Sequence, residues 1–251
     1  MKKMWNIRWF DTLGSTNDEL KKLAAAGAPE GTAVAARTQT GGKGRLGRSF
    51  QSPAGTGMYL SVLLRPQAPV EDCIHLTCAV AVAVHRAVEK CSGICCGIKW
   101  PNDLTWENRK LGGILTEVSA HDGIVEWAVV GIGINCRTPE GGFHDEIARI
   151  ATDLKSAGGD CTPEALAESV LQELKTLAET CVSDRESWMA EYRKHCITTG
   201  SSVQVLTPQG RTDALALDVA EDGGLVVQYA DGRRETVNSG EVSVRGMYGY
   251  T

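Results

Sequence analysis

A basic, glycine-rich segment at residues 41–48 restricts the fold of this chain more than any other sequence feature. It reads GGKGRLGR and contains G-x-G-x-x-G, the fingerprint of dinucleotide-binding doubly wound folds. In those folds the fingerprint opens a helix, whereas here Pro53, Gly55 and Gly57 follow and no helix can begin. The next apolar run, residues 58–64, is β-like and ends in Arg-Pro instead of an acidic residue. The segment is therefore not a dinucleotide-binding turn.

The same segment has the residue types of a phosphate-binding loop. Glycines let backbone N–H groups come close to a ligand, and Lys43, Arg45 and Arg48 add charged hydrogen-bond donors. The segment does not fit G-x-x-x-x-G-K-[ST], the pattern of the common phosphate loop. We therefore predict an anion-binding loop of another design.

Composition narrows the class of protein. The 251 residues suffice for one large domain and a small one, and the net charge of −5 gives no overall attraction to nucleic acid. No apolar run reaches the roughly 18 residues of a membrane span, so no membrane partner is expected. Because the N-terminus does not have the pattern of a secretory signal, we expect a cytoplasmic protein.

The nine cysteines follow no regular spacing, which favours reduced thiols in a cytoplasmic protein. Two groups contain metal-ligand residue types: the run 73–78, with two cysteines and a histidine, and Cys91 with Cys95 and Cys96. The first lies in an apolar, alanine-rich helical pattern, and the second lacks the paired spacing of zinc sites. We therefore expect no protein zinc site.

Hydrophobic periodicity predicts an α+β domain over residues 1–197 and a small β-barrel over residues 198–251. In the first domain, strands are expected at residues 7–10, 31–37 and 58–64, and an antiparallel hairpin at 110–117 with 124–135. Helices are expected at residues 16–27 and 70–90, from 163 with a stripe of Leu166, Val170, Leu174 and Leu177, and around Trp188 and Tyr192. In the second domain, short strands separated by glycine-containing turns are expected at residues 203–206, 213–219, 225–229, 235–237 and 242–245.

The polar run Ser15-Thr16-Asn17 and the later Lys99 each allow a functional and a purely structural interpretation. The run precedes a helix, and Thr16 with Glu19 resembles a capping box. Lys99 ends a short strand before Trp-Pro-Asn-Asp. It is either a buried cation with a partner or a surface lysine on an edge strand.

Two glycines in a predicted strand also allow two interpretations. Gly131 and Gly133 share a face with Asn135, whereas the apolar residues between them face the other way. Glycine inside a strand marks either the close approach of a ligand or another backbone, or a bulge or tight sheet packing. The first interpretation predicts a floor on which a flat ligand lies.

Four elements follow one another along the chain: residues 15–17; Gln39 with the glycine-rich loop; KWPNDL at 99–104 with KLGGIL at 110–115; and GIGIN at 131–135. Together they closely resemble the biotin protein ligases, specifically the bacterial enzymes that biotinylate the carrier subunit of acetyl-CoA carboxylase. The resemblance runs from about Trp9 to the C-terminus. It implies a mixed β-sheet flanked by helices, as in class II aminoacyl-tRNA synthetases, with a small barrel similar to Src-homology-3 domains.

The resemblance also implies residue roles. Lys99 matches the catalytic lysine of the family, and Arg45 is the second catalytic candidate. Biotin binding is implied for Ser15, Thr16, Asn17, Gln39, Gly42, Lys43, Gly44, Arg45, Lys99, Gly112, Gly113, Gly131 and Gly133. ATP or adenylate binding is implied for Lys43, Arg45, Arg48, Phe50, Asn102, Lys110 and Asn135, with Mg²⁺ held mainly by the ATP phosphates. Lys43 replaces the usual arginine of the family, and Phe50 stands where tryptophan is frequent, which bears on affinity.

The implied reaction has two steps. The biotin carboxylate attacks the α-phosphate of Mg-ATP to form biotinyl-5′-AMP, and a lysine of the biotin carboxyl carrier protein then takes the biotin and releases AMP. The winged-helix domain of repressor-type members is not recognisable, so we expect no nucleic-acid partner. A lipoate or octanoate ligase of the same architecture, a non-catalytic adenylate-binding regulator and a homodimer stay open.

Overall fold

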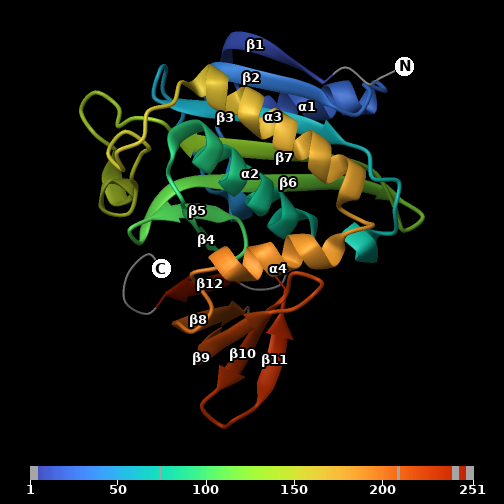
Figure 1. Cartoon of the computed structure of the whole chain (residues 1–251), viewed down its shortest axis with the longest axis vertical. Coiled ribbons are helices and arrows are strands. Elements are labelled where there is room, and N and C mark those ends of the chain that lie inside the picture. The colour runs from blue at the N-terminus through green and yellow to red at the C-terminus, as the bar shows by residue number, and fades with distance from the viewer. Residues whose placement is uncertain (1–4, 74, 208–209, 239–242, 247–251) are drawn as a thin grey trace.

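The computed structural model describes residues 5–73, 75–207, 210–238 and 243–246. It contains two β-sheets: a large one with helices on both faces, and a small one built from the C-terminal strands (Figure 1). The predicted α+β class is confirmed. A cavity, described below, lies on one face of the large sheet.

The large sheet is mixed and has the strand order β1-β2-β3-β7-β6-β5-β4. Strands β1 and β2 run parallel, joined by a helix, and the other neighbouring pairs are antiparallel. The hairpin predicted from the alternating pattern is confirmed as β6 and β7. The strand bounds are β1 Asn6–Leu13, β2 Thr32–Gln39, β3 Gly57–Leu64, β4 Gly97–Lys99, β5 Asp103–Trp106, β6 Arg109–His121 and β7 Ile124–Asn135.

Helices cover both faces of this sheet because successive strand residues point to opposite sides. In β7, Val129 packs in the small cluster beneath α1 (Thr16–Ala25), whereas Val130 belongs to the main core. The main core lies beneath α2 (Leu76–Ser92) and α3 (Pro163–Thr180). Helix α4 (Arg185–His195) runs between the large and the small sheet (Figure 1). Within the described residues, no helix combines the length and apolarity of a membrane span.

Two helix predictions need correction. The helix expected at 70–90 begins only at Leu76, after a 3-10 turn at Val70–Cys73, and residue 74 lies outside the described residues. The backbone N–H of Val70 donates to the Gly123 carbonyl in the β6–β7 turn. This hydrogen bond holds the start of the segment against the sheet, and the α-helix begins after it. The capping box is wrong as well: no side chain caps α1, because the Thr16 hydroxyl donates to Gln39 instead.

The small sheet has the order β11-β10-β9-β8-β12 and is antiparallel throughout. Its bounds are β8 Ser202–Thr207, β9 Gly210–Val219, β10 Leu225–Tyr229, β11 Arg234–Val237 and β12 Ser243–Gly246. All five predicted strands are present, although Val242 of the last one lies outside the described residues. Buried residues such as Val203 and Val227 belong to the same core cluster as α2. We keep 1–197 and 198–251 as the proposed domain division.

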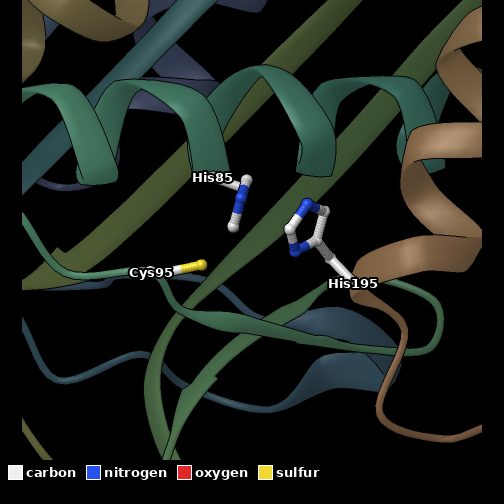
Figure 2. Close-up of side chains that lie close together, drawn as sticks. All are labelled: His85, Cys95 and His195. Atoms are coloured by element: carbon white, nitrogen blue, oxygen red, sulfur yellow. The ribbon is translucent and has the colours of Figure 1, made fainter.

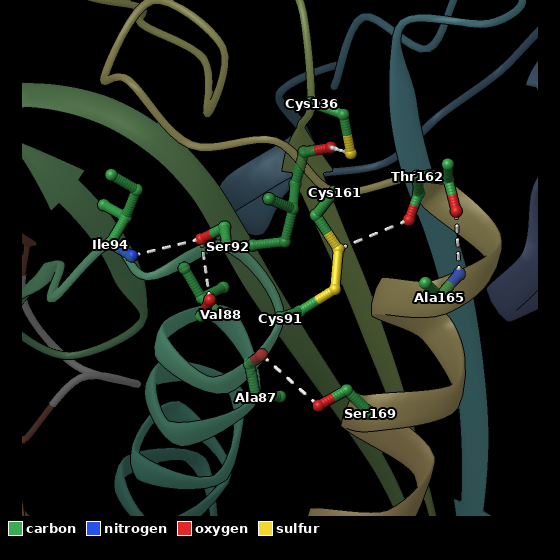
Figure 3. The surroundings of a disulfide bond; sticks show 11 residues. Ala87, Val88, Cys91, Ser92, Ile94, Cys136, Cys161, Thr162, Ala165 and Ser169 are labelled. Atoms are coloured by element: carbon green, nitrogen blue, oxygen red, sulfur yellow. Dashed lines mark hydrogen bonds between the residues drawn. A yellow bond between two sulfur atoms is a disulfide. The ribbon is translucent and has the colours of Figure 1, made fainter.

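The expectation that all cysteines are free thiols is wrong for one pair. Cys91 at the end of α2 and Cys161 before α3 form a disulfide, with Cα atoms 5.9 Å apart (Figure 3). The packing of α2 against α3 brings together two residues separated by 70 positions, which spacing alone does not reveal. Of the group at residues 73–78, His75 and Cys78 are buried packing residues, as expected: burial raises the pKa of Cys78 to about 12, and His75 Nε2 lies 2.7 Å from the Cys181 carbonyl oxygen.

Candidate active site

A cavity of about 1370 Å³ opens on the α1 face of the large sheet, beneath the glycine-rich loop. The predicted residues that line it are Ser15, Thr16, Asn17, Gln39, Lys43, Gly44, Arg45, Arg48, Phe50, Lys99, Asn102, Lys110, Gly113, Gly131, Gly133 and Asn135. Gly42 and Gly112 do not line it. A Cβ at Gly42 would lie 2.7 Å from Ser52 Oγ, and one at Gly112 would collide with Ile134. These two glycines therefore permit close packing instead.

A largely buried network of polar groups, neutral except for the Glu117 carboxylate at its edge, forms one end of the cavity. Gln39 Oε1 accepts hydrogen bonds from the Thr16 backbone N–H at 2.9 Å and from its hydroxyl at 3.1 Å. Ser61 Oγ lies 2.7 Å from Thr16 Oγ1 and 2.6 Å from Asn17 Oδ1. Asn17 Nδ2 donates to Glu117 at 2.8 Å. Because each member has a partner, the network holds amide and hydroxyl groups in fixed orientations.

The glycines of β7 form the floor of the cavity. A Cβ at Gly131 would collide with the Asn17 side chain, and one at Gly133 would lie 2.6 Å from the Phe50 ring. The pairing of β7 with β3 and β6 continues without a register shift through both glycines. The bulge interpretation is therefore wrong, and glycine is required here by close side-chain approach.

The glycine-rich loop is anchored by polar contacts on both sides of the cavity. Lys43 Nζ pairs with Asp18 of α1 at 2.6 Å, which lowers the pKa of that carboxyl group. Arg45 Nη1 donates to Asn102 Oδ1 at 3.0 Å. Between these anchors and the next strand, Leu46 adopts a positive φ of 56° and is 68% exposed. The loop tip thus has little packing to hold it.

Cations converge at the other end of the cavity. Lys99, the last residue of β4, lies opposite Asp103 of β5, and Lys110 Nζ pairs with Asp103 Oδ1 at 2.7 Å. Burial lowers the pKa of the Arg45 guanidinium, an effect that the Asp103 carboxylate opposes. Lys99 does stand on an edge strand, because β4 ends the sheet, but it is half-buried and lines the cavity, so it does not lie on an exposed surface. Among the described residues, seven basic side chains but only two acidic ones, Asp103 and Glu107, line the cavity, which leaves an excess of positive charge for an anionic ligand.

Sequence reasoning missed several residues at this site. Asp103 stands within KWPNDL, and its position across a tight turn from Lys99 was a usable signal. Arg109 and Arg149 also line the cavity, as does Gln204 of β8 in the small sheet. Arg149 and Gln204 reach the cavity only through the tertiary fold, and no local pattern marks them.

The small sheet also holds the segment that follows Lys99. The indole Nε1 of Trp100 donates to the Gly223 carbonyl at 2.8 Å, and its backbone N–H donates to Thr198 Oγ1 at 2.9 Å. The Trp100–Pro101 peptide bond is cis, and the buried Tyr192 hydroxyl of α4 donates to the Pro101 carbonyl at 3.2 Å. The C-terminal part of the chain therefore helps to position one wall of the cavity.

Family models match both parts of the chain. The model described as the biotin/lipoate A/B protein ligase family matches residues 9–135, and the model described as the biotin protein ligase C-terminal domain matches residues 198–245. The chain belongs to the biotin protein ligases. The resemblance drawn from its loop, its KWPNDL segment and its glycine strand is confirmed, and ligase is the activity of this family.

Comparisons with individual proteins support the same family assignment. This biotin protein ligase is 34% identical to the bifunctional ligase/repressor BirA of Bacillus subtilis, over 90% of this chain and 70% of the relative. It is 33% identical to the biotin–[acetyl-CoA-carboxylase] ligase of Mycobacterium tuberculosis, over 91% of this chain and 85% of the relative. A structure of the biotin protein ligase from Aquifex aeolicus in complex with biotin and ATP superposes with a TM-score of 0.82 at 29% identity, covering 97% of this chain and 100% of that one.

Proposed function

We propose that this biotin protein ligase depends on ATP, forms biotinyl-5′-AMP, and transfers biotin to a lysine of a carboxylase carrier domain. The observation that carries the proposal is a single cavity with a neutral hydrogen-bonding network at one end and clustered cations at the other. The neutral network suits a ureido group, and the cations suit a carboxylate and phosphates. The biotin and ATP in the complex from Aquifex aeolicus support the same pair of substrates.

The charges of the cavity match the first step. Biotin carboxylate and the α-phosphate are both anions, so fixed positive charge has to offset their repulsion and the charge that grows on the phosphate. Lys99, Arg45 and Lys110 line the cavity and supply that charge. The oxygens of Asp103 and Asn135 at the same cavity fit Mg²⁺, which prefers hard oxygen ligands and neutralises triphosphate charge when it is bound.

The second step needs no nucleophile from this chain. The amine of the acceptor lysine attacks the carbonyl of the mixed anhydride, the bond to AMP breaks, and biotin is left on an amide. The name of the Mycobacterium tuberculosis relative supports acetyl-CoA carboxylase as the source of the acceptor. The proposal places this chain with its acceptor in the cytoplasm, in line with its bacterial relatives, and keeps the homodimer as a hypothesis.

The test is incubation with biotin, Mg-ATP and a biotin-carrier domain, followed by intact-mass spectrometry. We expect one biotin adduct per carrier, release of AMP, and pyrophosphate exchange into ATP that requires biotin. A carrier whose acceptor lysine is replaced by arginine serves as the control and should stay unmodified. An unmodified wild-type carrier, or exchange that is independent of biotin, would refute the proposal.

Two other functions are tested alongside. The description of the N-terminal family model names lipoate as well as biotin, whereas the C-terminal model names biotin alone and favours it. Competition between labelled biotin and octanoate distinguishes the two acids. The Bacillus subtilis relative is named as a repressor too, so a DNA gel shift with biotinyl-adenylate present tests the proposal that this chain has no nucleic-acid partner.

Replacing Ser61 with alanine is expected to raise the KM for biotin about tenfold, because Ser61 Oγ contacts both Thr16 and Asn17 in the neutral network. The KM for ATP should change little, since Ser61 is remote from the clustered cations in the strand order. Steady-state pyrophosphate exchange measures both constants. Ser169→Ala on α3, which removes a hydroxyl that bonds the Ala87 carbonyl, is the matched control. Equal changes in both KM values would contradict the assignment.

Trypsin is expected to cut the glycine-rich loop at Lys43, Arg45 or Arg48 in the ligand-free protein, because the tip at Leu46 is exposed. Biotin with Mg-ATP should suppress this cleavage as the loop orders over the adenylate and excludes water. Mass spectrometry of the fragments over time measures the protection. Cleavage at the exposed Lys155 should be unaffected and serves as the internal control. Equal loop cleavage with and without ligands would exclude a closing loop.

A further inference from the structure

Two histidines and a cysteine meet away from the cavity. One ring nitrogen of His85, one of His195 and Sγ of Cys95 all lie within 4.8 Å of one another. They come from three separate places: His85 from the middle of α2, His195 from the last residue of α4, and Cys95 from the segment before β4. Figure 2 shows the three side chains directed toward a common point. The two imidazole rings are 4.0 Å apart between centroids.

We propose that His85, Cys95 and His195 form a binding site for one zinc ion. Two imidazole nitrogens and a thiolate are the borderline-soft donors that Zn²⁺ prefers. Ligand atoms around a tetrahedral zinc ion are about 3.3–3.8 Å apart, given its usual bond lengths. Binding brings the three ligand atoms, now within 4.8 Å of one another, to that spacing by rotation of the Cys95 and His195 side chains, which are less buried than His85. On binding, the Cys95 thiol gives its proton to solvent and its sulfur becomes a ligand.

The surroundings of His85 are those of a metal-binding histidine. Its Nδ1 lies 2.8 Å from the Cys96 carbonyl oxygen. Because a carbonyl oxygen only accepts hydrogen bonds, a neutral His85 carries its proton on Nδ1, which leaves the lone pair on Nε2 for a metal. Such a bond from the other ring nitrogen to a backbone carbonyl is how proteins orient histidine ligands. His85 is 1% exposed, so its ring is firmly held by packing.

The site also has an entry path and room for water as the fourth ligand of a tetrahedral set. The Glu89 carboxylate, one helical turn after His85, adds negative charge near the site and is not a member of the ligand group. Cys95 is exposed and His195 is half-buried, so the ion reaches the site from solvent. A bound ion would tie α2 and α4 to the segment that leads into β4, the strand that ends at Lys99.

The sequence did not predict this site, and no protein zinc site was expected. The three residues are separated by 10 and 100 positions, and only their meeting between two helices makes the set visible. Cys95 had been grouped with Cys91 in sequence, but Cys91 is joined to Cys161 by the disulfide. Cys91 therefore has no free thiolate to offer a metal. The other two proposed ligands of the site are His85 from α2 and His195 from α4.

The test uses the full chain and Co²⁺ as a spectroscopic probe for Zn²⁺. We expect one Co²⁺ per chain, with a sulfur-to-metal charge-transfer band and the intense visible bands of tetrahedral cobalt, and loss of both when one equivalent of Zn²⁺ is added. Cys95→Ser should abolish the charge-transfer band, and His195→Ala should weaken binding at least tenfold. Neither residue is fully buried, and circular dichroism should find both variants folded.

Two variants control for adventitious binding: Cys73→Ser, which removes another thiol, and His121→Ala, which removes an exposed imidazole. Both should bind Co²⁺ as the wild type does. Zn²⁺ should also raise the melting temperature of the wild type and of both controls by about 5 °C, but not that of Cys95→Ser. A wild-type spectrum without the charge-transfer band, or a band that survives Cys95→Ser, would overturn the proposal. None of these readouts depends on ligase activity.

Discussion

Replacing Lys99 with alanine is expected to slow biotinyl-adenylate formation on the order of a hundredfold or more while the fold stays intact. Lys99 lies at the end of β4 in the wall of the cavity, where, in the proposed reaction, its ammonium group would offset the charge of two reacting anions. Removing one preorganised electrostatic donor from an active site typically costs that much in rate. Its cross-strand neighbour Asp103 remains paired with Lys110, so the local structure has support without it.

Biotin-dependent pyrophosphate exchange measures this step directly, and circular dichroism with thermal melting checks the fold. Lys90→Ala, which removes an exposed lysine near the end of α2, is the matched control and should exchange at the wild-type rate. Lys99→Arg distinguishes the effect of the positive charge from that of the ammonium geometry, because it keeps the charge but changes the arrangement of hydrogen-bond donors. Exchange by Lys99→Ala within threefold of the wild type would remove Lys99 from the catalytic assignment.

Deleting residues 198–251 is expected to reduce adenylate formation at least tenfold, although every residue assigned to the reaction precedes that point. The deletion removes both hydrogen-bond acceptors of Trp100, the Thr198 hydroxyl and the Gly223 carbonyl. Each lost hydrogen bond costs about 0.5–1.5 kcal/mol, and Trp100 also loses apolar neighbours in the core. The deletion also removes Gln204 from the cavity wall. The segment after Lys99 should therefore lose its fixed position.

A variant of the full-length chain tests the same idea without removing a domain. Trp100→Phe keeps an aromatic ring but loses the indole N–H that donates to the Gly223 carbonyl. We expect the rate of pyrophosphate exchange to fall about fivefold to tenfold. Trp188→Phe is the matched control, since its indole donates to Thr180 Oγ1 at 3.0 Å away from the cavity. If a folded truncation and Trp100→Phe both kept wild-type rates of adenylate formation and transfer, the small sheet would be only a stabilising cap.

Local patterns predicted most of the fold. The alternation in residues 110–135 predicted the β6–β7 hairpin, and the apolar stripe of α3 is buried as expected. These predictions succeed because helix and strand periodicity are properties of neighbouring residues. They fail where a distant contact competes with a local one. Thr16 has a good capping sequence, but its hydroxyl bonds Gln39, and Val70 is tied to Gly123 before α2 begins.

In the candidate site too, local sequence patterns predicted some features, and contacts between distant residues determined the others. The proposed catalytic lysine, the glycine floor and the basic loop each stand in a contiguous segment, so the sequence could indicate them. The pairing of Lys43 with Asp18 and of Arg45 with Asn102 joins residues 25 and 57 positions apart, and no spacing rule predicts such pairs. The family resemblance implied ligand binding for Gly42 and Gly112, but neither lines the cavity, because glycine at a matching position serves close packing as well as close ligand approach.

The sequence by itself determined where most strands and helices lie along the chain, the position of the glycine-rich loop and the family, because each depends on residues that are neighbours in the sequence. Only the tertiary structure decided which side chains meet. It brought Gln204 to the cavity, joined Cys91 to Cys161, and placed His85, Cys95 and His195 together. The physical reason is that helix packing and sheet order bring together residues far apart in the chain, and local periodicity carries no information about such meetings.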